Sequence, residues 1–368
     1  MSRRAAVSFL SGTLVWLPLV WQGLPRGSAP DLSASDAEAL IQAGHYKRAR
    51  AILAPQLAAH PDDAKACYLL AEVKASFQDF DGALPLAQHA VDLDGKNSDY
   101  HLKLGQIYGE MAARASMFTA GSLALKFRKE VETAIELNPK NLDALDSLML
   151  FKFQAPGLMG GSKDEARTLA ERITQLNPSE GYLSQSELAE LEKNPAQMEA
   201  DYLKAVQADP KSYRALAALA RFYSHAPHAK YDESAQHAQD AVELDSQRAE
   251  AYSIRARVFA LQQRWGDLDR TLATAEKNVP DDLRPYLEAA RASLETEKDF
   301  PRAEGYAKKY LSQEAEGDEP DHAAAHRLLG LIFEKEGRIA DARAEIQTAL
   351  QLRPNFKAAK DDLKRLGN

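Results

Sequence analysis

The sequence predicts an all-α fold in which one two-helix unit is repeated about nine times. One observation is a recurring helix ending, in which an apolar and a polar residue usually precede a proline. The successive endings are spaced by 34, 44, 39, 32, 36, 34 and 74 residues, with markers at Pro61, Gly95, Pro139, Pro178, Pro210, Ser246, Pro280 and Pro354. A second observation is the helical spacing of apolar residues within the units. Ala342, Ile346 and Ala349, for example, share one face of a helix. A fixed period with helical spacing inside it indicates a stacked helical repeat.

The composition of the 368 residues excludes several classes of protein. The net charge is 46 − 54 = −8, which makes nucleic-acid binding a poor interpretation. The single cysteine, Cys67, excludes an internal disulfide framework and a thiolate zinc cluster. We expect Cys67 to be buried, because a free surface thiol in an oxidising compartment invites pairing between molecules.

The first segment, residues 1–29, predicts a secretory signal peptide. Arg3-Arg4 precede an uncharged apolar run over residues 5–21, and small residues follow at 27–29. The alternative is an uncleaved N-terminal anchor. Both interpretations export the rest of the chain, to the periplasm or the medium, either free or held at the inner membrane by this segment.

Residues 30–356 are expected to form the repeat array. In the clearest unit, residues 323–356, Leu329-Gly330-x-Ile332-Phe333 marks a first helix, Gly337 a turn, and Ala342 begins the apolar stripe of a second helix. Small residues are needed because two helices joined by a short turn cross at about 8–10 Å. The following proline ends the second helix.

Two units are longer than the others, and a final segment differs from all of them. The third unit exceeds the commonest spacing of 34 residues by 44 − 34 = 10 residues near 111–122, and the fourth exceeds it by 39 − 34 = 5 residues near 154–162. We expect both insertions to lie in loops on one edge of the array. Residues 357–368 are expected to form a charged capping helix that covers the last apolar surface.

These motifs resemble the tetratricopeptide-repeat (TPR) family, and in particular its exported bacterial members. Leu104-Gly105-x-Ile107-Tyr108 and the unit with Tyr252, Ala256, Phe259 and Pro280 fit the family pattern, whereas Lys74 stands where tyrosine is expected. The resemblance implies a right-handed TPR superhelical solenoid whose concave face binds a protein or peptide. It implies no enzymatic activity and no cofactor.

The residues singled out for partner binding are five arginines. In three successive units the residue after the small one of the first helix is an arginine, and the resemblance places that position on the concave face; two more arginines lie two turns earlier on the same helices. The set is Arg214, Arg221, Arg257, Arg284 and Arg291. Because guanidinium binds carboxylate bidentately, we expect an acidic segment or a free C-terminal carboxylate as the ligand. The alternative is that these arginines pair with neighbours such as Glu250 and Glu288.

The sequence therefore predicts a non-enzymatic interaction scaffold or adaptor of the bacterial cell envelope. The alternative is a binding protein for an anionic small molecule, a cell-wall fragment or a polysaccharide. No pattern supports a catalytic or metal site, and the histidine pairs at 225 and 228 and at 322 and 326 are interpreted as surface residues. Contact with a membrane is expected only through an uncleaved leader.

Overall fold

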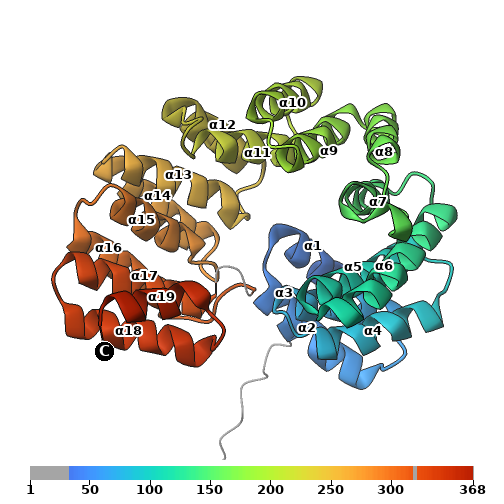
Figure 1. The fold of residues 1–368 in the computed structure, drawn as a ribbon, viewed down its shortest axis with the longest axis horizontal. Helices are drawn as coiled ribbons and strands as arrows, with labels where there is room; N and C mark the ends of the chain where they lie inside the picture. The colour runs from blue at the N-terminus through green and yellow to red at the C-terminus, as the bar shows by residue number, and fades with distance from the viewer. Residues whose placement is uncertain (1–32, 318–320, 368) are drawn as a thin grey trace, which may run out of the picture. The chain divides into compact units, whose positions relative to one another are not determined.

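The computed structural model describes residues 33–317 and 321–367 of the chain. Over these residues it contains nineteen α-helices, one short 3₁₀ helix (η1, Gly157–Met159) and no strand (Figure 1). The all-α class predicted from the sequence is therefore confirmed. The predicted leader, residues 1–29, lies outside the described residues.

The first eighteen helices pair in chain order into nine helical hairpins, as the repeat count predicted. The pairs are α1 (Ala34–Ala43) with α2 (Tyr46–Ala59), α3 (Ala64–Ser76) with α4 (Phe80–Leu93), α5 (Ser98–Arg114) with α6 (Met117–Leu137), α7 (Leu142–Gln154) with α8 (Lys163–Leu176), α9 (Pro178–Leu191) with α10 (Pro195–Ala208), α11 (Tyr213–Tyr223) with α12 (Tyr231–Leu244), α13 (Ala249–Leu261) with α14 (Trp265–Asn278), α15 (Arg284–Glu295) with α16 (Phe300–Tyr310), and α17 (His322–Lys335) with α18 (Ile339–Leu352). The last helix, α19 (Lys357–Arg365), packs on α18, where the capping helix was expected.

The first helices of the hairpins form a layer of their own. Each odd-numbered helix from α1 to α15 contacts the next odd-numbered helix, in addition to its partner within the hairpin. Side chains on successive first helices are therefore neighbours although they lie about 35 residues apart in the sequence. This layer is where residues of different repeats can form a common binding surface.

The core lies between the helices and is rich in alanine, because small residues let the helix axes approach. Gly330 of α17 shows the constraint directly. A Cβ atom added there would lie 2.7 Å from Cγ1 of Ile346 and 3.0 Å from the carbonyl oxygen of Ala342, both on α18. Cys67 is fully buried in the second hairpin, as expected, and burial raises the pKa of its thiol.

The turn between the two helices of a hairpin repeats its backbone conformation. Five of these turns contain one residue with a left-handed backbone, and φ is 77° at Gly337 and 56° at Gln263. The five residues are Gly44, Gln78, Lys193, Gln263 and Gly337; the turn between α15 and α16 contains two, Glu297 and Asp299, and the longer loop between α7 and α8 contains Gly160. Left-handed φ is costly for any residue with a Cβ, so the repeat geometry imposes strain wherever the position is not glycine.

The two longer hairpins accommodate their additional residues in different ways. In the third hairpin the prediction of a loop near 111–122 is wrong, because α5 extends to Arg114 and α6 begins at Met117. The additional residues therefore lengthen both helices, and α6 spans 21 residues. In the fourth hairpin the addition does lie between the helices, and it contains η1. Ser162 ends this loop by accepting a hydrogen bond from the Glu165 backbone N–H at 3.3 Å, which caps α8.

Charged side chains join the first hairpin to loops far later in the chain. The Lys47 backbone N–H donates to the Glu316 carboxylate at 2.6 Å, and the Lys47 ammonium lies 3.3 Å from the same group. Arg50 pairs with Glu314 at 2.9 Å in the same loop, which follows α16. These contacts involve residues of α2 and a loop more than 260 positions away.

Candidate partner-binding clefts

The five predicted arginines all lie on the first-helix layer, on three successive first helices. Arg214 and Arg221 belong to α11, Arg257 to α13, and Arg284 and Arg291 to α15. Helices α11 and α13 contact each other, as do α13 and α15. The periodic spacing of these arginines in the sequence thus becomes proximity in space.

Four of the five arginines line one cavity of about 370 Å³, which we call the arginine cleft. Its charged lining consists of Arg221, Arg257, Arg284 and Arg291 with Glu250 and Glu288, and Ser224, His225, Ser253 and Ile254 complete it. Four cations and two carboxylates give the lining a formal charge of +2 if His225 is neutral. The side chains that line the arginine cleft are therefore net positive, while Glu295 and Asp282, which pair with Arg257 and Arg284, lie outside the lining.

Two of these arginines are tied into the wall of the cleft. The buried Arg257 donates from both terminal nitrogens to Glu295, at 2.9 and 2.7 Å, so its guanidinium fork is engaged. Arg284 donates from Nε to Asp282 at 2.8 Å, and its Nη2 donates to the same carboxylate. These contacts fix both side chains in place before any ligand arrives.

The other two arginines keep donors available. Arg221 has 61% of its side chain exposed and donates only from Nη2, to Glu250 at 2.5 Å. Arg291 donates from Nη1 to Glu288 at 2.6 Å and is half-buried. A guanidinium has five N–H donors, so most of the donors of Arg221 and Arg291 make no hydrogen bond within the described residues. The pairing with Glu250 and Glu288 thus coexists with capacity for a ligand.

Arg214 lines a neighbouring cavity of about 610 Å³, which shares Arg221 and Glu250 with the arginine cleft. This second cavity is more acidic, since Glu187 and Glu190 also line it. Burial raises the pKa of Glu187 to about 7, and the nearby charge of Asp146 adds to the effect. The charge of this cavity therefore changes around neutral pH.

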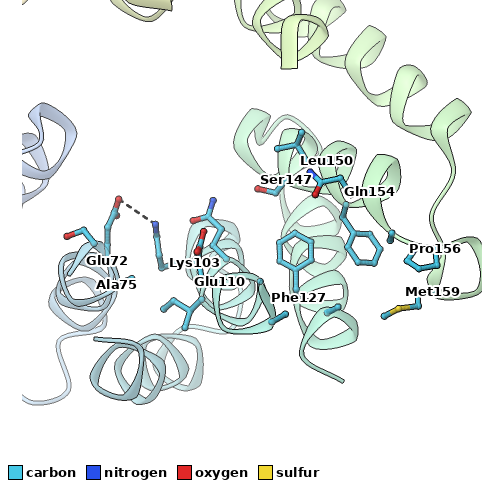
Figure 2. Close-up of a pocket in the computed structure, with 18 of the residues that line it drawn as sticks. Glu72, Ala75, Lys103, Glu110, Phe127, Ser147, Leu150, Gln154, Pro156 and Met159 are labelled. Atoms are coloured by element: carbon cyan, nitrogen blue, oxygen red, sulfur yellow. Dashed lines mark ion pairs between the residues drawn. The ribbon is translucent and has the colours of Figure 1, made fainter. Parts of the chain in front are cut away.

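A third and larger cavity, of about 650 Å³, is lined by the first helices α3, α5 and α7, by the second helix α6 and by Tyr46 of α2; we call it the apolar cleft. Figure 2 shows Glu72, Lys103 and Glu110, from α3 and α5, on one side of the apolar cleft. Apolar side chains of α6, α7 and the following loop form the other side, where the rings of Phe127 and Phe151 are 5.6 Å apart. This volume is within the range of small-molecule and peptide-anchor pockets.

Sequence reasoning missed the apolar cleft. Its apolar residues fit the helical spacing expected of any core position, so nothing in the pattern separates a cavity wall from a packed interior. The usable signal is the pair of small residues Gly109 and Ala112 on the first helix of the longest hairpin, both of which line the cavity.

The described residues contain no group of three or more His, Cys, Asp or Glu side chains arranged to hold a metal ion. His326, one of the histidines noted in the sequence, lies 2.6 Å from Glu345 instead. Within residues 33–317 and 321–367, no helix has the length and apolar character needed to span a membrane.

Two models of the tetratricopeptide repeat match the chain, one over residues 40–107 and one over residues 287–355. The chain carries tetratricopeptide repeats. The matches cover the second hairpin near one end of the array and the eighth and ninth near the other, and the hairpins between them stack in the same way. TPR arrays generally mediate protein–protein interactions and are typically non-enzymatic scaffolds.

The crystal structure of one solved protein, yeast Tom70, agrees with this fold. The TPR array is similar to the crystal structure of yeast Tom70, with 12% identity and a TM-score of 0.51, over 90% of this chain and 80% of that one. A thermophilic TPR protein of Thermus thermophilus is 18% identical with a TM-score of 0.45, over 52% of this chain and 98% of that one. Among curated proteins, none matches the chain.

Proposed function

We propose that this protein is a non-enzymatic adaptor of the bacterial cell envelope that binds a partner protein or peptide on its first-helix layer. In this proposal a carboxylate of the partner, from an acidic segment or a free C-terminus, binds in the arginine cleft. The observation that carries the proposal is the convergence of Arg221, Arg257, Arg284 and Arg291 on one cavity with a positive lining.

The contacts within the arginine cleft suit recognition of a carboxylate. Arg257 and Arg284 are held by Glu295 and Asp282, so the positive wall exists without a ligand and little ordering is needed on binding. Arg221 and Arg291 offer the free donors, and charge-assisted hydrogen bonds from arginine are about twice as strong as neutral ones. The partly buried Glu250 and Glu288 compete with a ligand for these arginines, which favours a partner that brings more than one negative charge.

The envelope location is supported by the sequence alone. The basic start, the apolar run over residues 5–21 and the small residues at 27–29 have the order of an export signal. Under this proposal the working chain begins near Pro30. Residues 33–368 form one compact unit, so a chain that begins at Pro30 keeps the whole array.

The alternative is an anionic small molecule or polysaccharide as the ligand of the same cleft. The cavity volume of about 370 Å³ supports this candidate, because it lies within the range of small-ligand sites. Both candidates require the same arginines, and they differ in whether a protein is captured.

The test is crosslinking capture from an envelope extract, with the chain from Pro30 to Asn368 as bait. The informative variant is Arg221→Gln with Arg291→Gln, because both side chains are accessible and neither is required by the wall. The matched control is Arg270→Gln on the second helix α14, whose side chain is 76% exposed and pairs only with Asp267.

We expect a specific protein to be recovered with the parent chain and with Arg270→Gln, and at least about tenfold less with the double variant. Synthetic peptides from that protein, with free and amidated C-termini, would then show which carboxylate binds. Equal recovery with the double variant would remove the arginine cleft from the proposal. Recovery of no protein with any of the three baits would support the small anionic ligand.

A further inference from the structure

The two longer hairpins meet at one edge of the array and expose apolar side chains there. The Arg128 guanidinium on α6 donates from Nη1 to the Met159 carbonyl oxygen at 3.1 Å, which ties α6 to the loop that contains η1. Gly121 lies beside the same loop, since a Cβ added to it would be 3.9 Å from Cε of Met159. The additional residues of the third and fourth hairpins therefore form one continuous feature.

Phe118 at the start of α6 and Leu158 within η1 form what we call the apolar tip. The exposed fractions are 98% for Phe118 and 94% for Leu158, so almost nothing in the described residues covers either side chain. Leu125, two turns after Phe118 on the same face of α6, is also exposed. Single exposed apolar residues are common, but two almost fully exposed ones on adjoining insertions are not expected by chance.

The apolar tip lies in a basic part of an acidic chain. Residues 111–129 and 154–163 together contain Arg114, Lys126, Arg128, Lys129 and Lys163 and no Asp or Glu, a charge of +5, with Glu110, Glu130, Asp164 and Glu165 at their borders. The remaining residues therefore carry −8 − 5 = −13.

Three of these five basic side chains form no ion pair with a carboxylate of the described residues. Arg114 and Arg128 pair with Glu110 and Glu132. Lys126, Lys129 and Lys163 are exposed and have no carboxylate partner among the described residues. Lys126 and Lys163 rest instead over the rings of Tyr108 and Phe153.

We propose that the apolar tip and its lysines dock this protein on an anionic lipid surface. Phe118 and Leu158 would enter the boundary between headgroups and acyl chains, while Lys126, Lys129 and Lys163 contact lipid phosphates. This contact is separate from the N-terminal leader, through which the sequence predicted the only membrane contact.

A lipid surface fits the tip better than a protein does. A protein partner needs a complementary surface around its anchor residues, usually a pocket or an apolar patch. Neither Phe118 nor Leu158 lines any of the three cavities described above, so the two protruding side chains belong to no such preformed pocket. A fluid headgroup layer accommodates isolated side chains without such complementarity.

The test is sedimentation of the chain from Pro30 to Asn368 with vesicles, so that the leader plays no part. One set of vesicles is pure phosphatidylcholine and the other contains phosphatidylglycerol as well. The apolar variant is Phe118→Ser with Leu158→Ser, and its matched control is Leu203→Ser with Leu352→Ser, two exposed leucines of α10 and α18. The charge variant is Lys126→Gln with Lys129→Gln.

We expect the parent chain to bind the anionic vesicles and the control variant to bind them equally well. Binding should fall at least about tenfold in the apolar variant and about fivefold for each lysine removed. Added salt should weaken binding by the parent more than binding by the lysine variant. Circular dichroism would confirm that each variant stays folded. We expect this because all four substituted apolar side chains are exposed. Failure of the parent to bind, equal binding to neutral vesicles, or unchanged binding by the apolar variant would each overturn the proposal. Loss of a captured protein in the apolar variant, without vesicle binding by the parent, would show that the tip contacts protein instead.

Discussion

Nδ1 of the His45 imidazole lies 3.0 Å from Oδ2 of Asp281, a residue 236 positions later in the chain. Both groups are in a polar cluster with Lys47 and Glu316, and Lys47 also donates to the Asp281 carbonyl oxygen at 2.8 Å. Burial alone would lower the pKa of His45, but the hydrogen bond and charge of Asp281 outweigh it and raise the pKa. Burial raises the pKa of Glu316 to about 7, against the opposing effect of Lys47. The contact between the first hairpin and the later loops thus includes two groups, His45 and Glu316, whose pKa is raised in the folded chain.

The array is predicted to lose stability as the pH rises from 6 to 8.5. His45 has a raised pKa, so its stabilising pair is present below about 6.5 and is lost as the pH passes the folded value. Glu316 acts in the same direction, because its buried carboxyl stays neutral while that of the unfolded chain ionises, so its contribution falls from the ordinary pKa of 4.5 up to the folded pKa of about 7. We expect a decrease of about 1–2 kcal/mol in the free energy of unfolding, measured by urea denaturation at several pH values.

Two variants separate Glu316 from other causes of this pH dependence. Glu316→Gln should flatten the decrease, because an amide does not ionise. Glu314→Gln is the matched control, since Glu314 lies in the same loop but is exposed. An unchanged pH profile in Glu316→Gln would contradict the assignment.

The left-handed turns between paired helices give a second prediction. Gln263 has φ 56° where Gly337 occupies the equivalent turn with φ 77°. Replacing Gln263 with glycine should stabilise the array by about 0.5–1 kcal/mol, because relief of left-handed strain exceeds the added chain entropy. Gly337→Ala should cost about 1 kcal/mol, and it tests backbone conformation alone because an added Cβ would meet nothing within 4 Å. Thermal and urea denaturation would measure the stability of both variants. The prediction requires Gln263→Gly to raise the free energy of unfolding and Gly337→Ala to lower it.

The parts of the fold that repeat along the chain could be predicted from the sequence. Hairpins, their order and the small residues between helices follow from a period of about 34 residues, because each helix packs mainly on its immediate neighbours. The same period places Arg221, Arg257 and Arg291 on adjacent first helices. The charged partners could not be predicted in this way, since Glu295 lies 38 residues after Arg257 and is outside the repeat pattern.

Contacts between distant parts of the chain, and the structure of irregular segments, could not be predicted from the sequence. The pair of His45 and Asp281 depends on small rotations summed over many hairpins, which no local pattern encodes. The insertion near 111–122 was expected as a loop because repeat arrays tolerate insertions there. Its four alanines and two methionines and its lack of proline instead favour the longer helices that form. Exposure of Phe118 follows from that lengthening.

The fork between Arg257 and Glu295 gives the last prediction, which separates the structural arginine of the cleft from the binding arginines. Arg257→Lys keeps the charge but cannot make two parallel hydrogen bonds, so we expect a cost of about 1–2 kcal/mol in urea denaturation. Arg257→Ala also loses the buried stem and should cost about 2–3 kcal/mol, whereas Arg270→Ala, at an exposed site, should stay within about 0.5 kcal/mol of the parent. If Arg257→Lys matched the parent, the fork would contribute no stability, and the guanidinium of Arg257 would be as available to a ligand as those of Arg221 and Arg291. A measured loss would instead mean that part of the positive wall is held by folding itself, so that a partner's carboxylate meets cations already in position.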